Sequence, residues 1–409
     1  MLFPLCVIAS AAIAQAPQAP LLEALQQNRL PLTMTDGRPA GPGWDLIVSE
    51  AKNARFTLIG EEHGVAETAQ LAAAMFAALR PSGYSRFAIE LSPPIARDIE
   101  AAAWRNGEQG VEDFLKTPDL FTFYNLHEET RLVADVVQGS PANARVLFGL
   151  DREIFNDRYL LSKLEPKVPP GARAAFARLK EASTAAWARY AQSRNPDDMF
   201  ILAADSSLVT AVRAAWPSPD PESDTILRSL EASMAVETQE RTGGVWPYME
   251  RRSQLGRDNF AALLRSDSSK ILLKLGYNHM IRGCNYFNGF DIGSMADEVA
   301  ALTGDRAFHV LVLPGPGSYQ AVLGGNGFAP VSSDQFDEFK AGDQRLTRVF
   351  SNPNASGHEV IDLRPLRRLA MRGLESWNAD VVRTIYGYDA IVIWKGAHAS
   401  TGLTEPRNR

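Results

Sequence analysis

The sequence predicts an α/β protein with a mostly parallel central sheet, flanking helices and a large helical insertion that forms a cap. Two observations carry this prediction. Short apolar runs of strand length alternate with amphipathic stretches of helix length, as in parallel sheets built from right-handed crossovers. One long interval, residues 155–265, has helical periodicity and little strand signal.

The chain starts with a leader segment and then enters the β-α-β rhythm. Residues 15–30 are expected to form a Pro/Gln/Ala linker and a short leader helix, followed by a Gly/Pro-rich turn at 37–43. Strands are expected at 55–60, 86–90, 146–150, 270–276, 308–313, 359–363 and 388–394. Helices are expected at 44–52, 65–79, 93–104, 126–137, 172–191, 198–216, 223–241, 248–264 and 294–302.

Two of these helices have clear local reasons. The Ala-rich segment 65–79 is apolar around much of its circumference, which suits a helix packed on a sheet. Pro93 and Pro94 open the segment 93–104, where the first helical turn tolerates proline. The domain boundaries that follow are a discontinuous α/β core at 31–154 and 266–400, with the insertion at 155–265 between its halves.

The N-terminus predicts export. Residues 2–14 form an apolar run too short to span a bilayer, and it ends in the small-x-small pattern Ala12-Ile13-Ala14. We therefore expect a signal peptide at residues 1–14, a periplasmic or secreted mature protein, and no stable membrane insertion after cleavage. The n-region carries no Lys or Arg, which departs from the usual pattern. Of the two cysteines only Cys284 would remain, so no intramolecular disulfide is expected.

The charge balance bears on the class of partner. With a net charge of −6 and no dense run of Lys and Arg, the chain is not expected to bind nucleic acid. A small-molecule or peptide substrate is the expected partner.

Four predicted strands end on polar side chains that are capable of catalysis. Glu61 and His63 follow the first, Glu90 the second and Asp151 the third, while Asn278 and His279 follow the strand at 270–276. Ligands of open parallel sheets bind outside the carboxyl ends of the strands, so these residues predict one site. A histidine there titrates near neutrality and serves as a general base or a metal ligand.

Several weaker motifs are set aside. His127-Glu-Glu-Thr-Arg131 begins like the zincin helix but lacks its second histidine. Cys284 stands alone without a nucleophile signature, and the glycine-rich turn Gly324-Gly-Asn-Gly327 lacks the strand-then-helix frame of a phosphate loop.

The ordered motifs resemble a known family. The motifs are Gly60-Glu61-Glu62-His63-Gly64-x-x-Glu67, Phe87-Ala-Ile-Glu90, Phe148-Gly-Leu-Asp151, Arg257-Asp258 and Asn278-His279. Together they resemble the erythromycin esterase-like proteins, whose superfamily also includes the haem-binding ChaN proteins and the Tiki-type metalloproteases. The esterases usually have two residues between Glu and His, whereas only Glu62 stands there in this chain. This shorter spacing is closer to the ChaN and Tiki branches.

The resemblance implies a hydrolase in which a histidine activates water directly against an ester, lactone or amide. It assigns His63 as the general base, Glu61 and Glu90 as catalytic carboxylates, and His279 as a second histidine. The expected supporting residues are Glu67, Asp151, Arg257 and Asn278.

Two alternatives stay open at this point. In the first, Glu61, His63, Glu90 and His279 are the ligands of a divalent metal, Zn²⁺ or Mn²⁺, in a Tiki-like hydrolase. In the second, the protein is ChaN-like and binds haem or another ligand without catalysis.

Overall fold

The structure is a computed structural model that describes residues 19–324, 327–333, 343–373 and 377–404. The predicted signal peptide at 1–14 lies outside the described residues, so export stays a prediction. Within the described part of the chain, no helix combines the length and apolar character needed to cross a bilayer.

The expected α/β class with a mostly parallel sheet is confirmed. One nine-stranded sheet has the order β2-β1-β10-β11-β7-β3-β6-β4-β5. The six strands from β11 to β5 are parallel, and β10, β1 and β2 add an antiparallel edge. The strands are β1 (Arg29–Thr35), β2 (Arg38–Ala40), β3 (Phe56–Glu61), β4 (Tyr84–Ile89), β5 (Leu147–Gly149), β6 (Lys270–Gly276), β7 (Ala307–Pro314), β10 (His358–Asp362) and β11 (Ala390–Trp394).

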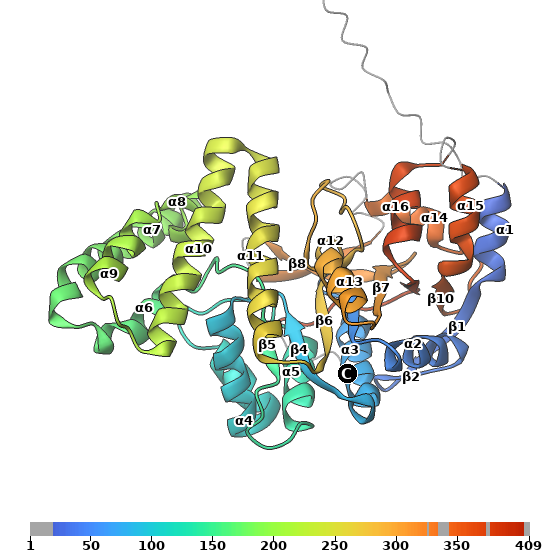
Figure 1. Ribbon diagram of the computed structural model, residues 1–409, viewed down its shortest axis with the longest axis horizontal. Coiled ribbons are helices and arrows are strands. Elements are labelled where there is room, and N and C mark those ends of the chain that lie inside the picture. Colours follow the sequence, from blue (N-terminus) through green and yellow to red (C-terminus); the bar gives the residue numbers. More distant parts are fainter. Residues whose placement is uncertain (1–18, 325–326, 334–342, 374–376, 405–409) are drawn as a thin grey trace, which may run out of the picture.

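Helices cover both faces of this sheet (Figure 1). Before the insertion they are α1 (Ala19–Gln27), α2 (Pro42–Lys52), α3 (Ala66–Leu79), α4 (Pro93–Leu115) and α5 (His127–Gln138). After it they are α12 (Tyr277–Met280), α13 (Ile292–Leu302), α14 (Asp343–Phe350), α15 (Arg367–Gly373) and α16 (Ala379–Gly387).

The interval between β5 and β6 is helical, as the sequence predicts. It contains α6 (Asp157–Leu164), α7 (Arg173–Ser193), α8 (Phe200–Ala203), α9 (Ser207–Ala215), α10 (Pro221–Gly243) and α11 (Val245–Ser266). In Figure 1 the green helices α7, α8 and α9 lie on the left, away from the strands, while α11 stands beside the sheet. The division into a core and a cap domain stays a prediction.

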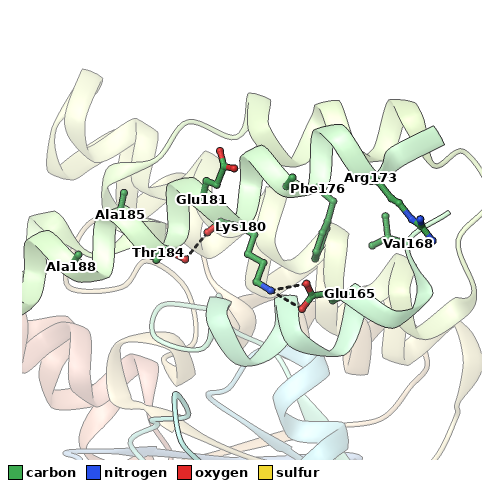
Figure 2. Close-up of a pocket in the computed structure, with 10 residues that line it drawn as sticks. Glu165, Val168, Arg173, Phe176, Lys180, Glu181, Thr184, Ala185 and Ala188 are labelled. Atoms are coloured by element: carbon green, nitrogen blue, oxygen red, sulfur yellow. Dashed lines mark hydrogen bonds and ion pairs between the residues drawn. The ribbon is translucent and has the colours of Figure 1, made fainter. Parts of the chain in front are cut away.

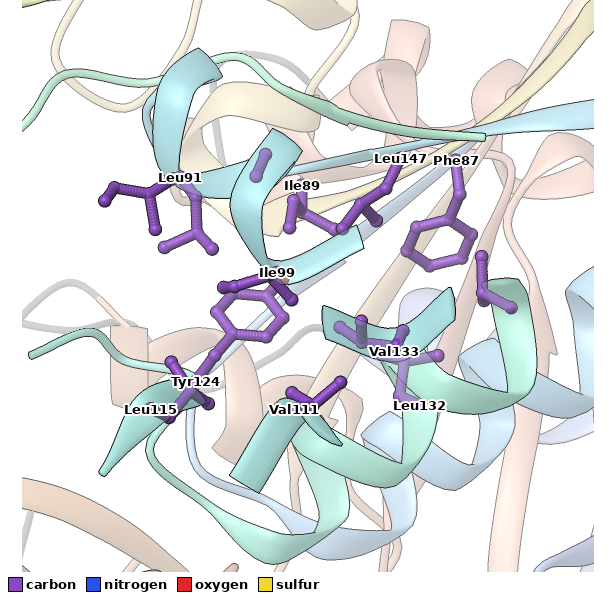
Figure 3. Packing of buried hydrophobic residues seen from close by; sticks show 14 of the residues in the cluster. Phe87, Ile89, Leu91, Ile99, Val111, Leu115, Tyr124, Leu132, Val133 and Leu147 are labelled. Atoms are coloured by element: carbon purple, nitrogen blue, oxygen red, sulfur yellow. The ribbon is translucent and has the colours of Figure 1, made fainter. Parts of the chain in front are cut away.

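Side chains of the strands alternate between two apolar cores. Along β6, Leu272 faces the core that α3, α4 and α5 help to form, whereas Leu273 and Leu275 face the core with α11 and α13. Figure 3 shows part of the first core, where Phe87 of β4, Ile99 of α4 and Val133 of α5 meet. This two-sided burial explains why the central strands are continuously apolar.

Three expectations for individual elements are wrong. The helix expected at 93–104 continues to Leu115 through a kink at Asn106 and Gly107, where the backbone is not helical. The single helix expected at 198–216 is two helices, α8 and α9, separated by Ala204 to Ser206. The turn expected at 37–43 contains β2, and the preceding strand β1 was not predicted at all.

A second sheet consists of one hairpin, β8 (Tyr319–Gly324) and β9 (Gly327–Ser332), paired antiparallel. Of the glycine-rich segment noted in the sequence, Gly324 ends β8 and is paired with Gly327 of β9, while residues 325 and 326 lie outside the described residues. This hairpin is important because it lies over the carboxyl end of β3.

Candidate functional site

The carboxyl ends of three neighbouring strands form the site. β3, β6 and β4 are adjacent in the sheet, in this order. Glu61 is the last residue of β3, Glu90 directly follows β4, and His279 lies on the short helix α12 directly after β6. The structure therefore brings Glu61, His63, Glu90 and His279 together from three separate parts of the sequence.

His63 lies between two carboxylates. Its Nδ1 is 3.1 Å from Oε1 of Glu61, and its Nε2 is 3.4 Å from Oε2 of Glu90. The side chain of Glu61 is 3% exposed, whereas that of His63 is 43% exposed, so the imidazole reaches solvent while its partner is buried. A carboxylate on each nitrogen fixes the ring orientation and favours its protonated form.

Glu90 is held by donors on several sides. The backbone N–H of Gly276 donates to Oε2 at 2.6 Å, and Arg252 of α11 donates to Oε1 at 2.7 Å. A Cβ on Gly276 would lie 3.2 Å from both Glu90 Oε2 and His63 Nε2, so glycine leaves room for this contact. Arg252 also binds Asp151 at 2.6 Å, which connects α11 to the end of β5.

His279 contacts Glu90 from the side opposite His63. Its Nε2 is 3.5 Å from Oε1 of Glu90, and its Nδ1 is 2.9 Å from Asp291, a carboxylate that Ser253 also binds. His279 is buried and does not line the cavity described below. Its geometry suits the positioning of Glu90 rather than a direct contact with substrate.

A buried lysine completes the charged cluster on the other side of Glu61. Lys274 projects from the middle of β6 and donates to Glu61 at 2.6 Å and to Glu129 of α5 at 2.8 Å. All three side chains are nearly inaccessible to solvent. The groups thus alternate in charge across the site, in the order Glu129, Lys274, Glu61, His63, Glu90, His279 and Asp291.

These contacts shift the pKa values of the histidines and of Glu90. Burial lowers the pKa of His63, but Glu90 and Glu61 more than offset this effect and raise it to about 10. Burial likewise lowers the pKa of His279, and Asp291 with Glu90 raises it to about 9. Burial raises the pKa of Glu90, yet the two imidazoles hold it well below its ordinary range. The surrounding carboxylates therefore favour the imidazolium form of both histidines.

The two carboxyls that share Lys274 behave differently. Burial raises the pKa of Glu129, and the pull of Lys274 does not fully offset it. At Glu61 burial acts in the same direction, but Lys274 and His63 together lower the pKa. Glu61 is therefore the carboxylate that stays ionised beside His63.

A cavity of about 250 Å³ opens above this cluster. Glu61, His63, Glu90 and Lys274 lie on its charged side, together with Glu62 and Glu129. Its other walls come from the segment 123–126 before α5 and from the β8–β9 hairpin. The described residues around it include none from 155–265.

The predicted supporting residues lie in different places. Asp151 joins the site through Arg252. Arg152 and Arg257 are the two partners that the sequence suggests for Asp151, and of these Arg152 lies 3.6 Å from it. Arg257 instead donates to Gln254. Asn278 accepts from the backbone of Tyr286, so the partner of His279 is Asp291 and not this neighbour.

Glu67 belongs to another contact. It lies in the first turn of α3 and accepts from Nδ1 of His398 at 2.7 Å and from the same residue's backbone N–H. Neither residue lines the cavity.

The expected metal ligands do not form a metal site in this structure. Among the described residues, no three His, Cys, Asp or Glu side chains are arranged to hold a metal ion. The physical reason is that Glu61 turns an oxygen to Lys274 and Glu90 turns one to Arg252, so protein cations take the place that a metal would occupy. The residues present do not fit Zn²⁺ or Mn²⁺.

Two motifs set aside in the sequence have structural roles. His127 is buried at the start of α5 and its Nδ1 is 2.9 Å from Glu112 of α4, so it joins two helices. Cys284 lies in the loop after α12, in an isolated bridge with Phe290.

A larger hollow, of about 710 Å³, lies along α7 (Figure 2). Its polar contacts include the exposed ion pair between Lys180 and Glu165, at 2.6 Å. Its lining contains apolar residues of α7 but no histidine or cysteine, and its Glu165 is held by Lys180.

Sequence reasoning missed Lys274, Glu129 and Arg252. A signal for Lys274 was present, because it is the one charge between the apolar residues 271–273 and 275 of a strand that was expected to be buried. Glu129 lay inside the zincin-like segment that was set aside. Arg252 carried no local signal, since its partners lie 101 and 162 residues away.

Comparison with known proteins identifies the fold. No protein-family model and no curated protein matches the chain. A succinoglycan biosynthesis protein of known structure has a TM-score of 0.62 at 14% identity, covering 95% of this chain and 99% of its own. A Bacillus cereus protein has a TM-score of 0.60 at 13% identity, covering 95% of this chain and 100% of its own.

A mutant of erythromycin esterase EreC, in its open conformation, is a third similar structure. Its TM-score is 0.56 at 12% identity, covering 89% of this chain and 95% of its own. Identities this low establish the fold and leave the activity to be argued from the residues. The chain therefore shares the fold of erythromycin esterase EreC along most of its length, as the resemblance in the sequence implied.

Proposed function

We propose that the protein is a hydrolase in which His63 activates water against an ester, lactone or amide. The observation that carries this proposal is the placement of a half-exposed imidazole between two carboxylates in the lining of a cavity. Glu61 orients the ring through the Nδ1–H, and Nε2, which lies at the longer 3.4 Å from Glu90, is the nitrogen that accepts a proton from water.

The reaction needs the neutral form of His63. Neutral His63 accepts a proton from water while the water oxygen forms a bond to the substrate carbonyl carbon, and the carbonyl electron pair moves to its oxygen. The imidazolium beside this oxyanion stabilises it. The bond to the leaving group then breaks, and the imidazolium returns its proton to that group.

The other charged residues act on these groups without contacting the substrate. Glu61 and Glu90 orient the imidazole, while Arg252 and His279 hold Glu90. The shared fold supports a hydrolase, since one of the three similar structures is an esterase. It carries no information on the alcohol or acyl part that this chain accepts.

The test compares two histidine variants on a panel of esters and lactones. His63→Asn should lower kcat/KM by at least about 10²-fold, because it removes the general base. His398→Asn is the matched control, since His398 also pairs with a glutamate but lies outside the cavity. It should retain wild-type activity.

Folding is checked by thermal unfolding of both variants. Turnover that survives in a folded His63→Asn protein would contradict the proposal. A wild type that hydrolyses nothing but binds haem, with a Soret band, would instead favour the ligand-binding alternative.

A further inference from the structure

We infer that the substrate of this site is an uncharged ester or lactone with a compact apolar acyl group, whose size is limited by the β8–β9 hairpin. This inference rests on the proposed function and adds the substrate class. It follows from the division of the cavity into charged and apolar sides, from the fixed position of the hairpin, and from the cavity volume.

The cavity is chemically two-sided. Its described lining includes four glutamates and two basic residues, all on the side of the strand ends. The walls from the segment 123–126 and the hairpin are mostly apolar, with Phe123, Leu126, Val322, Leu323 and Phe328 lining them beside Tyr124, Gln320 and Ala321. An apolar acyl group fits against this second side, while the scissile bond lies over His63. A substrate with a free carboxylate would meet the glutamates and is therefore disfavoured.

The hairpin is fixed to the residue next to the proposed base. The backbone N–H of Ala321 donates to the carbonyl of Gly64 at 2.8 Å. Gly64 has φ of +80°, and a Cβ there would lie 2.2 Å from the Ala321 oxygen, so only glycine permits this approach. The apolar side therefore keeps a set position relative to His63.

Aromatic contacts keep the wall of the hairpin in place. Phe328 stacks on Phe121 with ring centroids 5.8 Å apart, and Phe121 meets Phe155 edge-on at 5.3 Å. Phe155 meets Phe123, which stacks on His63 itself at 5.9 Å. Phe328 thus connects through packed rings to the imidazole.

The volume sets the size of the acyl group. A cavity of about 250 Å³ lies below the roughly 300–1,000 Å³ of sites that bury a drug-sized ligand. A short alkyl chain or a single aromatic ring fits beside His63, whereas a large macrocyclic lactone does not. Phe328 is half-buried and closes the end formed by the hairpin.

The experiment measures chain-length preference with p-nitrophenyl esters from acetate through butyrate and hexanoate to decanoate. The wild type should prefer butyrate or hexanoate and lose at least about 10-fold in kcat/KM on decanoate. Phe328→Ala should move the preference to the longer esters, and Leu323→Ala is a second variant of the same wall. Tyr319→Ala is the matched control, because this residue of β8 is exposed and lies outside the cavity lining.

A second readout does not depend on turnover. The His63→Asn protein is titrated calorimetrically with the neutral phenyl amides of butyric and decanoic acid. Tighter binding of the short amide, reversed by Phe328→Ala, supports the size limit even if the wild type hydrolyses no ester. Equal binding of both amides would overturn the inference, and so would wild-type hydrolysis of decanoate as fast as butyrate. Unchanged chain-length preference in folded Phe328→Ala would also overturn it.

Discussion

The orientation of His63 depends on one carboxylate that is close in sequence and on another that is distant. Glu61 is two residues away, so the motif itself placed one carboxylate beside the ring. Glu90 and His279 were predicted because each follows a strand; in the structure Glu90 contacts His63, and His279 contacts Glu90. Asp291 and Arg252 were not predicted, because they act through Glu90 and His279 and lie on elements whose position a sequence does not reveal.

Among single residues, the charge of Glu90 has the largest effect on the pKa of the His63 imidazole. Burial lowers the pKa of His63, and Glu90 is the strongest of the groups that raise it to about 10. Glu90→Gln removes that charge, so the pKa of His63 should fall toward or below its ordinary 6.5. A ¹⁵N NMR titration of the His63 imidazole measures this. Glu67→Gln is the control, since it neutralises a glutamate that pairs with His398 instead. An unchanged His63 titration in Glu90→Gln would contradict the account.

At the scale of elements, seven strands of the large sheet were predicted, whereas its edge strands β1 and β2 and the β8–β9 hairpin were missed. β3, β6, β7 and β11 are runs of mostly apolar residues, which are visible in the sequence. In β1, Leu30, Leu32 and Met34 alternate with polar residues as in a strand, but Pro31 interrupts the pattern and argued against it. The β8–β9 hairpin was missed because its glycine-rich turn was compared with phosphate loops instead of hairpin turns.

β6 carries a charge whose removal should destabilise the protein. Lys274→Met leaves Glu61 and Glu129 buried without their cation, and breaking such a network costs roughly 3–5 kcal/mol. Lys270→Met is the control on the same strand, because Lys270 donates only to the backbone of Lys52 at a partly exposed position. It should change stability by less than about 0.5 kcal/mol. Urea unfolding measures the free energy of unfolding of both variants. Equal values for the two would show that the buried lysine does not stabilise the fold.

At the scale of the whole molecule, the strand order assembles the site. β3, β6 and β4 are neighbours although about 180 residues separate β4 from β6 in sequence. The sequence predicted the parallel elements and the helical interval between them, but strand order depends on how the crossovers pack. Arg252 of α11 and the pair Arg152–Glu237 connect the helical region to the strand ends.

The charged cluster should make global stability depend on pH. The folded-state pKa values of His63 and His279, about 10 and 9, lie above the ordinary 6.5. Protonation of both histidines therefore stabilises the fold fully below about pH 6.5, and this contribution is lost as pH rises through 9 and 10. The free energy of unfolding, measured in urea, should fall over this range, and less steeply in His63→Asn. A stability that is constant from pH 7 to 10 would contradict the pKa values.

Activity and stability should then respond to pH in opposite directions, since catalysis needs the neutral imidazole that the fold disfavours. The most direct test of the central claim is the pH dependence of kcat/KM for wild-type hydrolysis of p-nitrophenyl butyrate, corrected for the uncatalysed reaction. We predict that kcat/KM rises with pH and levels off only near the His63 pKa of about 10. If kcat/KM levels off near pH 6.5, or does not depend on pH, a base held between two carboxylates is not the group that activates water in this protein.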